Sequence, residues 1–218
     1  MLFGDVIDSR RAPEAAGDWL RTLSDSLEEA YGTDERLAPV GFTQGDELQA
    51  LLAVDADPLL AVLIGSLHEH AMPMRWSIAA GPVVRGSGPA TERSGEAFLR
   101  ARDGIERAKG DRDLLVISTG EPGADRLLAG LAPVLGEMLR SLTTRQRRVA
   151  SLMLVEGLRQ AEVADRLHVA RATVSVAHAR GGIRSIDRLV TAIRAIFRAG
   201  ILAQADEAAA ALGAGGGL

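Results

Sequence analysis

The sequence predicts an α+β protein, in which a ferredoxin-like, palm-type antiparallel sheet domain is followed by an all-α helix-turn-helix domain. The first observation behind this prediction is the order of apolar patterns in residues 1–120, where strand and helix spacings follow β-α-β-β-α-β-α-β. The second is the purely helical spacing of residues 142–205. The third is a change of net charge between these two parts, which indicates that they contact different partners.

The charge is divided unevenly along the chain. Residues 1–140 carry 23 acidic and 14 basic side chains, a net charge of −9, whereas residues 141–200 carry 11 arginines and 4 acidic residues, a net charge of +7. A basic module on an acidic body favours contact with phosphate groups by the second part only. The chain has no cysteine, which excludes a disulfide framework and a cysteine-ligated zinc site.

The start of the chain lacks the basic and apolar segments of a signal peptide, and no run of residues is long and apolar enough for a membrane span. The expected compartment is therefore the cytoplasm, with no membrane partner. The first apolar run is short and abrupt. We expect either that the native chain begins further upstream or that its first strand is short.

In the first part, apolar runs of strand length are expected to form a sheet with its helices on one face, and its first strand is expected to be central. Strands are expected at residues 2–7, 75–80 and 114–118, with a hairpin at 37–54 around a turn at 44–46. Helices are expected at residues 13–31, 58–70 and 95–109. The predicted units are a sheet domain (1–121), a linker helix (122–141), a helix-turn-helix domain with a C-terminal helix at 185–205 (142–205) and a flexible tail (206–218).

The basic segment at residues 142–183 has the pattern of three short helices. Thr143 can cap the first helix, and Gln146 three residues later completes a capping box. The second helix is expected at residues 160–167 and the third at 171–180. Three side chains of the third helix are expected to face a DNA groove: Arg171, Thr173 and Ser175. Five arginines are expected to contact phosphates: Arg145, Arg147, Arg148, Arg159 and Arg180.

This segment, LTTRQRRV followed by QAEVADRLHVARATVSVAHAR, resembles the helix-turn-helix of LuxR-type regulators and of the DNA-binding region of bacterial sigma factors. The resemblance implies double-stranded DNA as a partner, and half-site recognition by one motif implies a homodimer. The chain departs from the pattern at Ala170, where a Ser or Thr cap is usual, and at Val176 and His178. Gly181 and Gly182 are expected to weaken or end the third helix.

Four acidic residues form the second candidate site. Asp5 and Asp8 lie at the end of the first strand, and Asp46 and Glu47 lie in the hairpin, which should pair with that strand. Carboxylates that converge at one edge suit Mg²⁺, which prefers hard oxygen ligands and often shares the phosphates of a nucleotide. The alternative interpretation is that these carboxylates only cap turns. No lysine lies near these motifs in the sequence.

Three motifs, GDVIDSR, FTQGDELQALL and GEAFLRARDGIERAK, together resemble the SatD family over residues 1–120. The pattern is also similar to the palm domain of class III nucleotide cyclases and GGDEF-type enzymes. That likeness implies that Asp5 and Asp46 are metal positions. The chain departs from the cyclases where their later helix supplies an Asn and an Arg, because it offers Leu99 and a displaced Arg102.

These patterns leave three functional interpretations. The first is a transcriptional regulator whose N-terminal domain senses a nucleotide or metal ligand or mediates dimerisation. The second is a Mg²⁺-dependent nucleotidyl cyclase or transferase with an appended DNA-binding module. The third is a non-catalytic interaction protein whose N-terminal half only dimerises.

Overall fold

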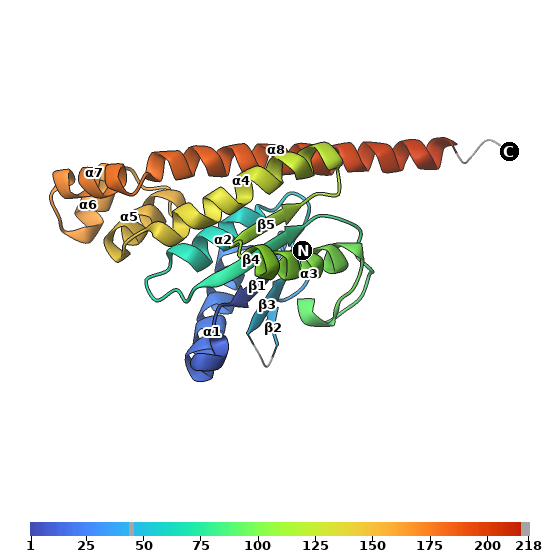
Figure 1. Ribbon diagram of the computed structural model, residues 1–218, viewed down its shortest axis with the longest axis horizontal. Helices are drawn as coiled ribbons and strands as arrows, with labels where there is room; N and C mark the ends of the chain where they lie inside the picture. The colour runs from blue at the N-terminus through green and yellow to red at the C-terminus, as the bar shows by residue number, and fades with distance from the viewer. Residues whose placement is uncertain (44–45, 215–218) are drawn as a thin grey trace.

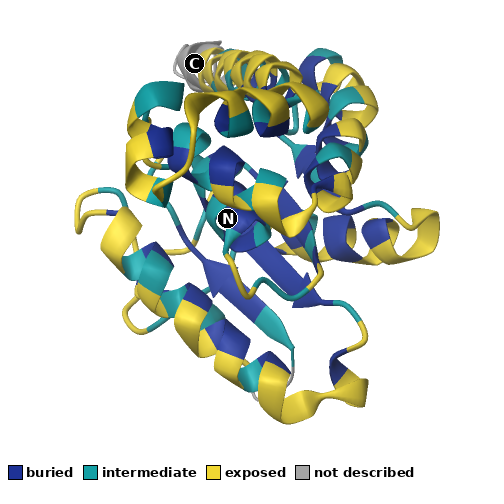
Figure 2. Ribbon diagram, turned by 90° about the vertical axis from the view of Figure 1, so that its left-hand side faces the viewer, coloured by how far each residue is buried: buried dark blue, intermediate teal, exposed yellow. Residues whose placement is uncertain are grey.

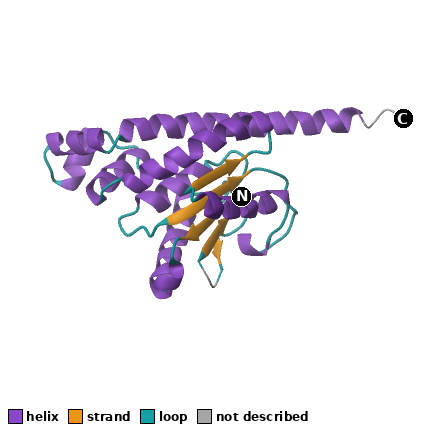
Figure 3. Ribbon diagram, viewed as in Figure 1, coloured by secondary structure: helices purple, strands orange, loops and turns teal. Residues whose placement is uncertain are grey.

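The computed structural model describes residues 1–43 and 46–214, with side chains described as far as residue 207, and joins one sheet to a group of helices (Figures 1 and 3). The sheet contains β1 (Leu2–Val6), β2 (Gly41–Phe42), β3 (Glu47–Ala50), β4 (Met74–Ala79) and β5 (Leu115–Ser118). Three helices lie between the strands: α1 (Pro13–Ala30), α2 (Pro58–Leu67) and α3 (Glu96–Asp111). The helices after the sheet are α4 (Pro122–Ser141), α5 (Thr144–Leu154), α6 (Gln160–Leu167), α7 (Arg171–Arg180) and α8 (Ile183–Ala214).

The strand order β2-β3-β1-β4-β5 places β1 at the centre, as the sequence predicted. β1 pairs antiparallel with β3 and β4, and β2 pairs with β3 as the expected hairpin; residues 44–45 of its turn lie outside the described residues. The first four strands therefore have the ferredoxin-like order. β5 pairs with β4 in parallel, because α3 carries the chain back across the sheet between them. The predicted α+β class is confirmed, but the sheet is mixed, because the β4–β5 pair is parallel whereas the sequence predicted an antiparallel sheet.

The sheet is covered on both faces, which corrects the expectation that its helices share one face. Leu2 and Val6 of β1 belong to a large core with α1, α2 and α4. Phe3 between them points to the opposite face, where it meets Phe98 and Ile105 of α3. All five residues of β1 are buried, and the helices expose their outer sides (Figure 2). Covering both faces explains why β1 lacks alternating apolar and polar residues.

α4 joins the sheet to the C-terminal helices. It packs against β5 and runs alongside α8 (Figure 1). Its buried residues, among them Leu128, Leu135 and Leu139, belong to the same apolar core as Val149 of α5 and Ile186 of α8. The division of the chain into a sheet domain, a linker helix and a DNA-binding domain stays a prediction. In the structure the linker segment contributes to the core on both sides.

α5, α6 and α7 form the expected helix-turn-helix arrangement at one end of the molecule (Figure 1). The capping box is confirmed. Thr143 Oγ1 accepts a hydrogen bond from the backbone N–H of Gln146 at 3.4 Å, and the backbone N–H of Thr143 donates to Gln146 Oε1 at 2.8 Å. The turn between α6 and α7 depends on His168, which has a left-handed backbone with φ of 52°. α7 ends at Arg180, and Gly181 and Gly182 separate it from α8, as expected.

α8 is a single helix of 32 residues, about 48 Å long at 1.5 Å per residue. It begins earlier than expected and continues to Ala214, beyond the predicted end at residue 205; residues 215–218 of the predicted tail lie outside the described residues. Gly200 permits α8 to approach the turn after β5, since a Cβ there would lie within 3 Å of Thr119 and Ala124. Ile201, Gln204 and Ala205 still lie beside residues of the sheet, and only the far end of the helix extends past it (Figure 1).

We expect His168→Gly to stabilise the protein by about 0.5–1 kcal/mol, because glycine adopts the left-handed conformation without the steric cost of a Cβ. Thermal unfolding followed by circular dichroism measures the change. Arg166→Gly, two residues earlier in the last turn of α6, is the control and should lower stability, by at most about 1 kcal/mol, because its backbone is helical. A loss of stability in His168→Gly would contradict the proposed strain.

Candidate nucleic-acid interface

The outer face of α7 carries two of the three predicted groove residues. Arg171 and Ser175 are exposed one turn apart, whereas Val174 and Ala177 are buried against the neighbouring helices. This division follows from the 3.6-residue period of the helix. Thr173, the third predicted residue, is half-buried and lies on the side of α7 that borders α5.

A hollow between α5 and α7 brings further predicted residues together. Arg145 and Arg148 of α5 line it with Thr173, so α5 presents two exposed arginines beside the start of α7. Glu69, from the loop after α2, lines the same hollow. An acidic residue of the sheet region therefore lies next to the basic face, which a separate helix-turn-helix would not have.

The remaining two arginines that were predicted to contact phosphates lie just before α6 and at the end of α7. Arg159 precedes α6, where its amide donates to Glu162 Oε2 at 2.7 Å, and Arg180 is the last residue of α7; both side chains are exposed. Within residues 1–43 and 46–207, five exposed arginines of the helix-turn-helix form no ion pair: Arg145, Arg148, Arg159, Arg171 and Arg180. Their charges are not neutralised locally, as contact with a polyanion requires.

Arg147 does not lie with this basic face, although the sequence placed it among the phosphate contacts. Its side chain is half-buried and lines a cavity between α2, α4 and the sheet. Successive residues of a helix are about 100° apart, so Arg148 can face outward while Arg147 faces the body of the protein. The sequence could not predict which of the two arginines faces inward, because it does not show which side of α5 packs against the body of the protein.

The structure brings three of the four predicted acidic residues to one end of the sheet. Asp5 of β1 lies opposite Glu47 of β3, and Asp46 directly precedes that strand and accepts a hydrogen bond from Ser9 Oγ. Asp8 follows the same end of β1 but does not join their contacts. It is exposed, has a left-handed backbone and forms an ion pair with Arg11 at 3.5 Å.

Basic side chains that the sequence did not connect with this end of the sheet meet the acidic residues there. Asp5 is only 6% exposed, and its carboxylate lies 3.4 Å from Lys109 Nζ and 3.5 Å from Arg75 Nη1. Glu47 pairs in the same way with Arg102 at 3.5 Å. Burial raises the pKa of Asp5, although the ammonium group of Lys109 favours its charged form. Lys109 is the only lysine of the chain, which is the one signal that could have drawn attention to it.

A magnesium ion at this edge would compete with these ion pairs, because both oxygens of Asp5 already face a cation. Among the described residues, no group of three or more His, Asp or Glu side chains is arranged to hold a metal ion. The residues present therefore fit a network of ion pairs better than a Mg²⁺ site. Binding of Mg²⁺ or a nucleotide at this edge stays a prediction.

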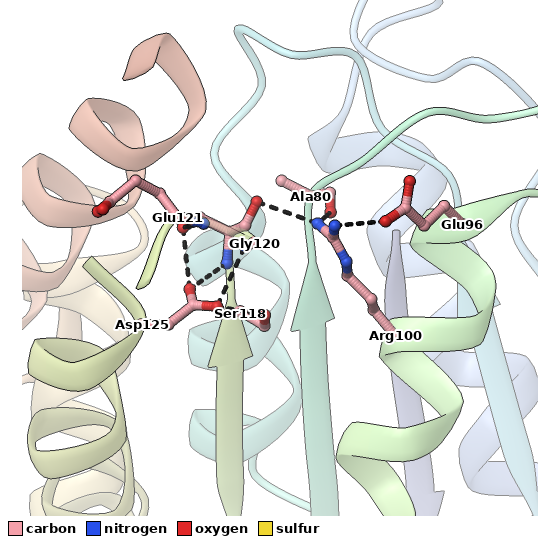
Figure 4. A network of polar contacts seen from close by, with 8 residues as sticks. Ala80, Glu96, Arg100, Ser118, Gly120, Glu121 and Asp125 are labelled. Atoms are coloured by element: carbon pink, nitrogen blue, oxygen red, sulfur yellow. Dashed lines mark hydrogen bonds and ion pairs between the residues drawn. The ribbon is translucent and has the colours of Figure 1, made fainter. Parts of the chain in front are cut away.

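A second polar network, which sequence reasoning missed, ties together the ends of β4 and β5 (Figure 4). Arg100 of α3 donates to the carbonyl oxygens of Ala80 and Thr119 at 3.0 and 3.2 Å and pairs with Glu96. Asp125 of α4 accepts from Ser118 Oγ and Gly120 N and twice from Thr119, at 2.6–3.1 Å. Burial opposes the charge of Asp125, but these hydrogen bonds together hold its pKa below the ordinary value.

Comparison with known proteins supports the C-terminal part of this description. Residues 134–181 match the family model of sigma-70, region 4. The matched segment extends from the second half of α4 to the end of α7. No curated protein and no solved structure matches the chain. None of the helices in the described part of the chain is both long and apolar enough to cross a membrane.

We expect Asp125→Asn to lower stability at pH 7 by about 1.5–3 kcal/mol, because the amide nitrogen of asparagine cannot accept the hydrogen bonds that a charged carboxylate accepts. Since the folded-state pKa of Asp125 is lowered, its contribution is present above the unfolded-state value near 3.8 and is lost as the pH falls through the folded-state pKa. Denaturant unfolding at pH 7 and pH 3 measures this. Asp103→Asn on the exposed side of α3 is the control, and an equal effect of Asp125→Asn at both pH values would contradict the assignment.

Proposed function

We propose that the protein is a DNA-binding transcriptional regulator that places α7 in the major groove of double-stranded DNA. The observation that carries the proposal is the exposed face of α7, bordered by unpaired arginines, within a segment that matches sigma-70 region 4. An α-helix fits the major groove, where side chains from its N-terminal half reach base edges.

The positions of the side chains divide their roles. Arg171 and Ser175 project from the exposed face of α7 and would contact base edges, with Thr173 at the side of the groove. Arg145, Arg148, Arg159 and Arg180 surround that face and would contact phosphates, which sets the position of the helix without reading sequence. The α7 N-terminus has no side-chain cap at Ala170, so its free amide groups add to the positive potential.

A homodimer is expected because a single helix-turn-helix contacts only half of a typical DNA site. One helix-turn-helix covers a half-site, and specific binding generally pairs two of them about 34 Å apart along the duplex. An exposed apolar side chain on α8 supports pairing, because Leu202 is 60% exposed. The sheet domain, which resembles SatD, would sense a ligand or contribute to the dimer, and the protein would act in the cytoplasm.

Loss of a phosphate contact should change the salt dependence of DNA binding, whereas loss of a base contact should change the base preference. We expect Arg148→Gln to weaken binding to all duplexes and to reduce the slope of log affinity against log salt concentration by about 1. Arg171→Gln should instead cost about 1–3 kcal/mol on the preferred site and change the base preference. Fluorescence anisotropy with selected and scrambled duplexes at several salt concentrations separates the two.

Arg21→Gln on the exposed side of α1 removes the same charge far from the basic face and is the control. It should leave both quantities unchanged. Affinity of the native protein that does not depend on salt for any duplex would refute the DNA-binding proposal.

Glu69 should weaken DNA binding, because it lies in the same hollow as Arg145 and Arg148. We expect Glu69→Gln to increase DNA affinity about twofold to fivefold at low salt, with a smaller increase at high salt, since exposed charges are screened. Glu29→Gln on α1 makes the same charge change at a distance. If both variants gain affinity equally, the effect comes from net charge and not from the position of Glu69.

A further inference from the structure

A cavity of about 80 Å³ lies at the junction between the sheet and the helix-turn-helix. Val62 and Gly65 of α2, Trp76 of β4 and Leu139 of α4 contribute to its walls, and Met72 of the loop before β4 lies at its side. Arg147 of α5 completes the lining, with Arg140 of α4 nearby. The walls are thus mainly apolar, and both basic groups come from the helices that lead into the DNA-binding unit.

Arg147 borders this cavity with a buried, unpartnered Nε. The Nε atoms of Arg75, Arg93, Arg147 and Arg194 are all buried without a hydrogen-bond partner in the described part of the chain, and of these four arginines only Arg147 lines the cavity. Arg75 and Arg194 still have carboxylate partners, Asp5 and Asp57. Within residues 1–43 and 46–207, Arg147 forms neither an ion pair nor a side-chain hydrogen bond, so a permanent positive charge borders the cavity without a counter-ion from the protein.

We propose that this cavity binds a small organic anion, a short-chain carboxylate, as a ligand of the protein. The carboxylate group would accept charge-assisted hydrogen bonds from the guanidinium of Arg147. Arg140, at the side of the cavity, is already paired with Glu137 at 2.7 Å, so Arg147 supplies the uncompensated charge. The alkyl chain would lie against Trp76 and Met72 and replace water at apolar walls.

The size and position of the cavity define the ligand and its effect. Pockets for larger ligands enclose about 300–1,000 Å³, so a nucleotide does not fit this cavity. A ligand here would contact the sheet through Trp76 and α5 through Arg147 at the same time. The residue next to Arg147 is Arg148, which lies on the basic face. Occupancy would therefore affect how α5 is held against the body, but binding of the anion does not require the DNA-binding proposal to be correct.

Tryptophan fluorescence tests this site directly, because the chain has two tryptophans and only Trp76 lines the cavity. In the full-length Trp19→Phe variant, titration with butyrate should give a saturable change in Trp76 emission at constant ionic strength. Butyramide has nearly the same shape and no charge, and it should bind at least tenfold more weakly. No saturable change with butyrate, or an equal response to butyramide, would overturn the proposal.

A matched pair of variants tests the role of Arg147. In the same background, Arg147→Met should weaken butyrate binding at least tenfold, whereas Arg148→Met, on the other side of α5, should leave it unchanged. Equal butyrate binding by the two variants would overturn the assignment. If Arg147→Met does not fold, as judged by circular dichroism, Ala71→Leu fills the cavity from the loop after α2 and should abolish binding. Retained binding in Ala71→Leu would show that the anion binds elsewhere.

Discussion

The structure depends on the burial of α4 on two sides. One side of this helix covers β5, and the other runs along α8, so a single apolar core extends from Leu2 in the central strand to Ile193 in α8. Leu128, Leu135 and Leu139 are at most 2% exposed. The helix-turn-helix therefore shares an apolar core with the sheet through α4.

Charge is distributed unevenly over the molecule, and the exposed arginines of α5 and α7 lie at one end of it. At the acidic end of the sheet, the carboxylates of Asp5 and Glu47 meet Lys109, Arg75 and Arg102, so most of the charge there is compensated within the protein. The exposed arginines of α5 and α7 have no such partners among the described residues. This difference, more than net charge, distinguishes a surface available to phosphates from one that stabilises the fold.

Local features were predictable from the sequence, because they depend on residues close together in the chain. The capping box of Thr143 and Gln146, the end of α7 at Gly181 and the central position of the first strand are all confirmed. The parallel pairing of β5 and the cover on both faces of the sheet were not predicted. An apolar run such as that of β5 pairs equally well in either direction, and only the path of α3 decides between them.

The sequence by itself determined which segment carries the basic helices and where α6 and α7 begin and end, since charge and helix signals are local. The tertiary structure decided which side chains of those helices are available. Arg147 and Arg148 are adjacent and chemically identical, yet one lines an internal cavity and the other faces outward, because α5 packs against α2. The tertiary structure also brings Lys109 to Asp5, more than a hundred residues away along the chain, a contact that no local pattern encodes.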